Sequence, residues 1–186
     1  MSRAPSILVL TLSALLLAAG CGGGFKVGSP WNPNESRFFD DGIDLIKQPS
    51  KLGGEWAYNH EEELDARVNL GDLTCLVSVL TVQTTTDLDG KEAKRIEAQV
   101  TEVFYGNTPT EKIVLQSSKD SLGYPLIVRH ERHLTGEFLA FIRWFDREDG
   151  SLGHHFHLSP SSLEMRKKVQ AMIDKRKEEE ERLKMN

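Results

Sequence analysis

The chain has 186 residues, of which 39% are hydrophobic and 27% charged, and its formal net charge is −5. An acidic chain lacks the basic footprint that nucleic-acid binding requires, so nucleic acid is excluded as a partner. The length is sufficient for one domain with a single hydrophobic core.

Residues 1–20 have the pattern of a signal peptide. Arg3 supplies a positive charge ahead of an apolar run from Ile7 to Leu17, and small residues follow the run. The apolar segment ends at Gly20, so it is too short for a permanent membrane-spanning helix, which needs about 20 residues. Cys21 comes directly after this segment.

The stretch Leu17-Ala18-Ala19-Gly20-Cys21 resembles the lipobox of a bacterial lipoprotein. The resemblance implies cleavage before Cys21, a diacylglyceryl group on its sulfur and acylation of its amine. Two or three acyl chains anchor a protein stably to a membrane. The alternative is an ordinary secretory signal in which Cys21 is a chance residue. With residues 1–20 removed, Arg3 is lost and the net charge changes from −5 to −6.

Cys75 is the second of two cysteines, so the mature chain has no partner for an internal disulfide. It lies in the apolar run Leu73–Val77, where a free cysteine acts as a small buried hydrophobic residue. A reactive or intermolecular thiol is the alternative.

Residues 21–36 are predicted to be a flexible tether, because they contain three consecutive glycines followed by two prolines. Within it, Trp31 either touches lipid headgroups or docks on the domain. Residues 37–72 form a mixed helix and loop segment, with a short helix at 59–64 capped by Asn59.

Residues 73–158 are predicted to form a β-domain. Strands are expected at Leu73–Thr84, Lys94–Val103, Ile113–Gln116, Leu126–Arg129, Phe138–Phe145 and Leu152–Leu158. Alternation fails at Val103 and Phe104, which indicates a bulge or bend. We expect a mainly β (α+β) fold, namely a small antiparallel OB-like β-barrel or sandwich with a long C-terminal α-helix.

Residues 159–186 are predicted to form that helix. Pro160 suits the first helical position, and Ser161 with Glu164 fits a capping box. After Asp174 the sequence is highly charged, which favours a solvated helix held by i,i+4 charge pairs or a frayed tail. The apolar stripe consists of Leu163 or Met165, with Val169, Met172 and Ile173.

Three segments carry a resemblance to bacterial relatives of the netrin/tissue-inhibitor-of-metalloproteinase domain: Ala98–Gly106, Ile113–Leu115 and Gly136–Ile142. The resemblance implies a five-stranded OB-like barrel over residues 73–158. Those inhibitors chelate a protease zinc through a free N-terminal cysteine and contain disulfides. A lipidated Cys21 on a tether cannot do this, so the inhibitory function is not carried over.

The histidines are candidate metal ligands. His155 and His157 share one face of a predicted strand, a spacing that can place two imidazoles on one zinc or copper ion. His130 or His133 would add a third ligand if its loop folds over that face. Against this reading, arginines next to His130 and His133 repel a cation, and exposed histidines are common on a polar strand face.

Aromatic side chains occupy both faces of the predicted strand 138–145. One face must belong to the core, and the other is a partner surface unless the C-terminal helix covers it. The candidates for this surface are Trp144, Phe145 and Phe141.

No catalytic constellation is recognised. The acidic pairs, such as Asp40 and Asp41, fall in predicted turns or solvated helices, and the serines lack a nucleophile elbow. We therefore expect a lipid-anchored cell-envelope protein that is not an enzyme. Its expected role is binding, scaffolding or assembly with a protein partner, without a cofactor other than the lipid. A periplasmic metal-binding protein is the alternative.

Overall fold

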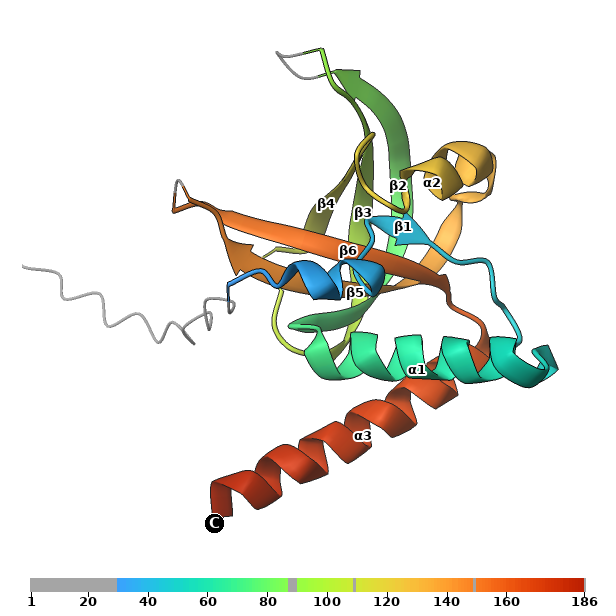
Figure 1. Cartoon of the computed structure of the whole chain (residues 1–186), viewed down its shortest axis with the longest axis vertical. Helices are drawn as coiled ribbons and strands as arrows, with labels where there is room; N and C mark the ends of the chain where they lie inside the picture. Colours follow the sequence, from blue (N-terminus) through green and yellow to red (C-terminus); the bar gives the residue numbers. More distant parts are fainter. Residues whose placement is uncertain (1–29, 87–89, 109, 149, 186) are drawn as a thin grey trace, which may run out of the picture.

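The computed structural model describes residues 30–86, 90–108, 110–148 and 150–185. These residues form a mixed α+β fold in which a six-stranded sheet curls into a half-barrel and two long helices lie on one side of it (Figure 1). The predicted signal peptide, the predicted lipid site Cys21 and most of the turn after Thr86 lie outside the described residues.

The sheet has the strand order β1-β6-β5-β2-β3-β4. Neighbouring strands are antiparallel, except that β1 pairs with β6 in parallel. The strands are β1 (Gly42–Ile43), β2 (Leu73–Thr86), β3 (Glu92–Tyr105), β4 (Lys112–Ser118), β5 (Gly136–Asp146) and β6 (Leu152–Pro160). The helices are α1 (Gly54–Leu70), α2 (Tyr124–His130) and α3 (Leu163–Met185), with 3₁₀ turns η1 (Pro33–Arg37), η2 (Pro49–Lys51) and η3 (Glu131–His133).

Strands β2 to β5 are arranged as a Greek key. β2, β3 and β4 follow one another, and β5 returns through α2 and η3 to lie beside β2. The imidazole of His154 on β6 lies next to the backbone of Val114 on β4, which acts against the lowering of the His154 pKa by burial, and this contact links the two sides of the half-barrel. The Greek key thus curls without a continuous ladder between β4 and β6.

Five of the six predicted strands are confirmed, and so is the predicted bend. Tyr105 lies opposite Thr74 and Val103 lies opposite Cys75, so Phe104 is left over as a bulge. The predicted strand at Leu126–Arg129 is wrong, because these residues belong to α2. Pro125 favours a helix start, and a short apolar run does not by itself distinguish helix from strand.

The protein has two hydrophobic clusters, one on each face of the sheet. The cluster inside the half-barrel includes Ile96, Leu115 and Phe156. The cluster on the other face packs Leu139 and Phe141 of β5 against α1 and α3. The two long helices therefore cover the outer face of β5.

Of the two alternatives for the second face of β5, the structure shows the one in which helices cover it. Phe141 is fully buried beneath α1 and α3, and Trp144 is buried in the inner cluster. Of the three candidates, Phe145 alone remains partly accessible. The predicted apolar stripe of α3 provides the cover through Met165, Val169 and Ile173.

α1 and α3 both begin at residues other than those predicted from the sequence. α1 starts at Gly54 with Gly53 as its N-cap, so Asn59 lies inside the helix rather than at its cap. Burial of Leu64 and Val68 against the sheet stabilises the longer helix, and such packing outweighs local capping signals.

α3 begins after the sheet rather than at Pro160. Pro160 is the last residue of β6 and lies opposite Phe138. Ser162 rather than Ser161 caps the helix, since its Oγ accepts from the backbone N–H of Met165 at 3.1 Å. Glu164 forms no capping box, because it accepts from the backbone N–H of Ser50 at 2.6 Å.

The charged half of α3 is helical and docked by polar contacts. The guanidinium of Arg176 lies 3.8 Å from the centre of the Tyr105 ring and donates to the carbonyl of Gly71 at 2.8 Å. The Tyr105 hydroxyl donates to Glu180 at 2.6 Å. The predicted i,i+4 pairs include Arg176 with Glu180 at 3.0 Å. No helix among the described residues has the length and apolar character needed to cross a membrane.

The predicted tether is shorter than residues 21–36, because its C-terminal part is docked on the domain. The ring of Trp31 lies 4.2 Å from that of His155. η1 follows, and Glu35 within it forms an ion pair with Arg143 of β5 at 3.0 Å. Of the two alternatives for Trp31, docking is what the structure shows.

Candidate functional site

The sequence-predicted histidines lie in two separate regions. The first, which we call the β1–β6 network, comprises Asp40, Asp41, Asp44, His155 and His157. The second, which we call the α2–β5 pocket, is a hollow that includes His130 and His133. We describe each region in turn.

The β1–β6 network forms because the two-residue strand β1 pairs with the end of β6. Gly42 lies opposite His157, and Ile43 lies opposite Leu158. The aspartates that flank β1 therefore meet the histidines on the same face of β6. Gly42 is required at this crossing, since a Cβ there would lie 2.6 Å from the Cα of Gly123.

His157 is held between two carboxylates. Its Nδ1 lies 2.8 Å from Asp40, its Nε2 lies 3.2 Å from Asp44, and its side chain is 3% exposed. Burial is the largest influence on the pKa of His157 and lowers it, as does Arg67. The hydrogen bonds and charges of the two carboxylates outweigh both, so the pKa lies above its ordinary value of 6.5.

Asp44 is the complementary group. Burial raises its pKa most strongly, but the hydrogen bond and positive charge of His157 outweigh this, and hydrogen bonds from Ser159 and the backbone of Ile46 add to the effect. The pKa therefore lies below 3.8. Arg67, which is 3.9 Å from Asp44, places a second cation beside the carboxylates. His157 and Arg67 thus lie beside the carboxylates of Asp40 and Asp44, so positive groups face negative ones here.

His155 is also engaged. Its Nδ1 lies 2.9 Å from Asp41, and its ring stacks on Phe145 with the centres 4.9 Å apart. Asp41 adopts a left-handed backbone conformation with φ of 53° and accepts a further hydrogen bond from the backbone N–H of Phe156 at 3.2 Å. These contacts hold the His155 ring in place next to Trp31.

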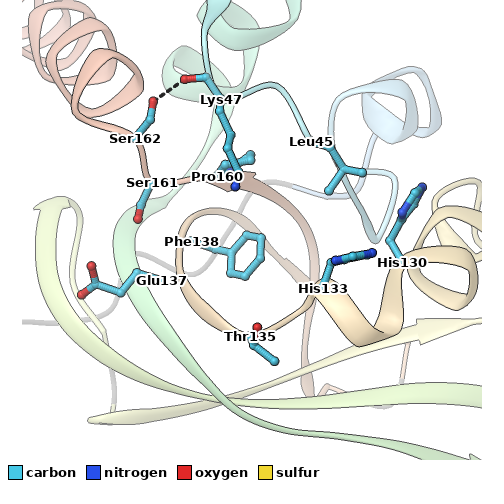
Figure 2. A pocket seen from close by; sticks show the side chains of 10 residues that line it. All are labelled: Leu45, Lys47, His130, His133, Thr135, Glu137, Phe138, Pro160, Ser161 and Ser162. Atoms are coloured by element: carbon cyan, nitrogen blue, oxygen red, sulfur yellow. Dashed lines mark hydrogen bonds between the residues drawn. The ribbon is translucent and has the colours of Figure 1, made fainter.

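The α2–β5 pocket has a volume of about 660 Å³ and lies where the segment after β1, the end of η3, the start of β5 and the approach to α3 meet (Figure 2). It falls within the range of small-molecule sites. Its lining residues are Leu45, Lys47, His130, His133, Thr135, Glu137, Phe138, Pro160, Ser161 and Ser162.

Ser162 holds the wall of this pocket together. Its hydroxyl donates to the carbonyl of Lys47 at 2.6 Å, as drawn in Figure 2, and also accepts the capping hydrogen bond at the start of α3. Both contacts use the hydroxyl as a structural link between two segments. This fixes the position of Lys47, whose side chain extends into the hollow.

The charges of the pocket are unevenly satisfied. Glu137 accepts from Arg166 at 2.7 Å, so its negative charge is compensated. Among the described residues, Lys47 has no carboxylate within ion-pair distance. His130 and His133 lie beside each other with ring centres 6.1 Å apart. The pocket therefore combines apolar side chains with two imidazoles and a lysine that has no carboxylate partner among the described residues.

The structure does not gather the four histidines around one point. His155 and His157 share a face of β6, as predicted, but both ring nitrogens of His157 are taken by carboxylates. His130 and His133 line the other region. No group of three or more His, Cys, Asp or Glu in the described part of the chain has the geometry to hold a metal ion.

Two features were missed by sequence reasoning. Asp40 and Asp41 were assigned to a solvated turn, but Asp41 is buried and both bind histidines of β6. Lys47 and Phe138 were not recognised as pocket residues, because no local pattern links residues so far apart. The thiol of Cys75 is buried as predicted, and burial raises its pKa to about 12.

Comparison of the chain with protein-family models, with curated proteins and with solved structures found no match.

Proposed function

We propose that this chain is a lipid-anchored cell-envelope protein that acts without catalysis, as a binding, scaffolding or assembly subunit. The lipobox-like sequence that ends at Cys21 supports the anchor. The α2–β5 pocket supports binding, because it is an open hollow with an apolar floor and polar groups at its rim. The partner is a protein of the same envelope compartment.

The observation that carries this proposal is the placement of two features at opposite ends of β5. Trp31 lies ten positions after Cys21 in the sequence, and its ring contacts Phe145 near the C-terminal end of the strand. The pocket contains Glu137 and Phe138 at the N-terminal end. A strand rises about 3.3 Å per residue, so these ends are about 23 Å apart.

This arrangement suits a tethered binding module. Nine residues separate Cys21 from Trp31, and the ten steps from one Cα to the next span at most about 35 Å, so the domain stays close to its anchor. The pocket lies at the end away from the point where the tether joins, and it remains open to a partner. In an organism with two membranes, the periplasmic face of the outer membrane is the expected location, since Gly22 replaces the retention aspartate of enteric lipoproteins.

The side-chain chemistry supports binding rather than turnover. The Ser162 hydroxyl links two segments, and the buried aspartates neutralise His157 and Arg67. For the fold, we propose an OB-like barrel, which is a partly open Greek-key arrangement. The Greek-key order of β2 to β5 and the His154 link between β6 and β4 support this assignment.

The anchor is tested by metabolic labelling with radioactive palmitate and by intact mass. We expect the label to enter the wild-type chain and the mature mass to begin at Cys21 with acyl groups attached. Cys21→Ala should lose the label and leave the membrane fraction. An unlabelled wild-type chain that begins at another residue would exclude the lipid anchor.

Binding at the pocket is tested by site-specific photo-crosslinking in intact cells. A photoreactive residue at Leu45, on the pocket, is compared with one at Leu152, at the start of β6. The two side chains are matched, with 44% and 41% exposure. Crosslinks to an envelope protein from position 45 but not from 152 support the proposal, and equal or absent crosslinks at both positions contradict it.

A further inference from the structure

We propose that the α2–β5 pocket recognises a carboxylate attached to an apolar group, with Lys47 as the residue that selects the negative charge. This inference rests on the proposed function and names the class of ligand that the pocket takes. Two sources share this chemistry, a short acyl acid and the free C-terminus of a peptide with an apolar last residue.

The apolar part of the ligand has a defined place. Phe138 forms a rigid part of the lining, since its side chain is only 5% exposed and β5 is paired with both β2 and β6 at this position. Leu45 stands on the neighbouring wall and is 44% exposed (Figure 2). Burial of alkyl or aromatic groups against such surfaces contributes about 25 cal/mol per Å².

The negative part of the ligand is favoured by the charge balance. Lys47 lines the hollow and lacks an ion-pair partner among the described residues, while the one carboxylate in the lining, Glu137, is bound by Arg166. Ser161 and Ser162 lie just ahead of the first turn of α3, whose N-terminal end carries a partial positive charge. The imidazoles of His130 and His133 offer further nitrogen donors.

A second hollow in the same protein shows the opposite charge. The lining of the cavity of about 390 Å³ beside Trp31 includes Asp40, Asp41 and Asp120, and no lysine or arginine is among the described residues that line it. The net charge of the chain is −5. The α2–β5 pocket differs from this hollow, because its lining includes a lysine that has no carboxylate partner among the described residues.

The test compares charged and neutral probes on the full chain in lipid nanodiscs, with empty nanodiscs as the background. Hexanoate is compared with hexanamide, and an acetylated tripeptide ending in leucine is used as the free acid and as the amide. Isothermal titration or saturation-transfer NMR gives the dissociation constants. We expect one of the two acids to bind about tenfold more tightly than its amide, which corresponds to about 1.4 kcal/mol.

Substitutions in the pocket test whether it is the source of the difference in affinity between acid and amide. Lys47→Met should remove the difference between acid and amide, and Leu45→Glu should reverse it by placing a negative charge on the wall. Lys51→Met is the matched control, because Lys51 is an exposed lysine of η2 outside the lining and should leave the selectivity unchanged.

The outcomes separate this inference from the proposed function. Selectivity for hexanoate identifies an acyl acid, and selectivity for the tripeptide acid identifies a peptide C-terminus. If acid and amide bind equally, the charge selection is refuted while the pocket remains a binding site. If no probe binds above the nanodisc background, the ligand class is refuted. Palmitate labelling and crosslinking from position 45 decide the proposed function independently.

Discussion

The β1–β6 network and the α2–β5 pocket both combine histidines with charged side chains, but they differ in how the charges are satisfied. In the network, His157 contacts two carboxylates and is almost completely buried. In the pocket, His133 and Lys47 are exposed, and Lys47 has no carboxylate partner among the described residues. The same residue types therefore serve stability in one region and remain available for a ligand in the other.

The two regions differ in the partners of their histidines rather than in residue type. A buried charge must be paired, because an unpaired one costs several kcal/mol. An exposed cation is solvated by water without a partner, so it remains available to bind a ligand. If this distinction is correct, substitutions in the two regions should differ in their effects on stability.

The largest effect is expected from His157→Ala. The change leaves Asp40 and Asp44 without their shared cation, and loss of one member of a buried ion pair costs about 3–5 kcal/mol of the free energy of unfolding. Urea denaturation followed by circular dichroism measures this loss. His133→Ala, the control in the pocket, should change the free energy of unfolding by less than about 0.5 kcal/mol. Equal effects at both positions would refute the distinction.

The second effect is a dependence of stability on pH. The pKa of His157 is higher in the folded chain than its ordinary 6.5, so its contribution is complete below pH 6.5 and is lost as the pH rises through the raised value. Asp44 acts in the opposite direction, because its lowered pKa gives a contribution that is complete above pH 3.8 and is lost as the pH falls.

The free energy of unfolding, measured from about pH 5 to about pH 9, tests the contribution of His157 to stability. Wild-type protein should lose stability on the alkaline side of this range. His157→Gln keeps a hydrogen-bond donor but cannot be protonated, so its curve should be flatter there. A variant curve that falls as steeply as the wild-type curve would show that another group causes the loss.

The sequence predicted most of the sheet because its strands carry local signals. β2 and β5 are apolar on both faces, β3 alternates, and turns separate them, so their existence depends on neighbouring residues alone. β1 has only two residues and exists through its pairing with β6, which no local pattern encodes. α2 was mistaken for a strand for a related reason, since the three apolar residues Leu126, Ile127 and Val128 are too few to establish a period.

For the two histidine regions, the sequence predicts which histidines share a face but not which residues they contact. The shared face of His155 and His157 follows from the two-residue period of a strand. Their partners do not, since Asp40 and His157 are 117 positions apart in the chain. The pocket likewise combines residues 45–47 with residues 130–138 and 160–162. Such contacts depend on the register of the whole sheet, which individual motifs do not determine.

A third, intermediate effect is expected from His155→Ala. The change removes one of the donors to Asp41 and the stacking contacts with Phe145 and Trp31. The backbone N–H of Phe156 still satisfies Asp41, so the loss should be about 1–2 kcal/mol of the free energy of unfolding. Hydrogen exchange of η1 should accelerate, because Trp31 loses one of the two rings that it packs against. Unchanged exchange would mean that other contacts, such as Glu35 with Arg143, hold this segment.

The smallest effect is expected from Lys47→Met, which tests whether the charge of Lys47 contributes to the stability of the fold. Lys47 is exposed and compensates no carboxylate among the described residues, so its replacement should alter the free energy of unfolding by less than about 0.5 kcal/mol. Together with a loss of acid selectivity, an unchanged denaturation curve would show that its charge is held for a ligand. A loss above 1 kcal/mol would instead place Lys47 with the buried, mutually satisfied charges of the β1–β6 network.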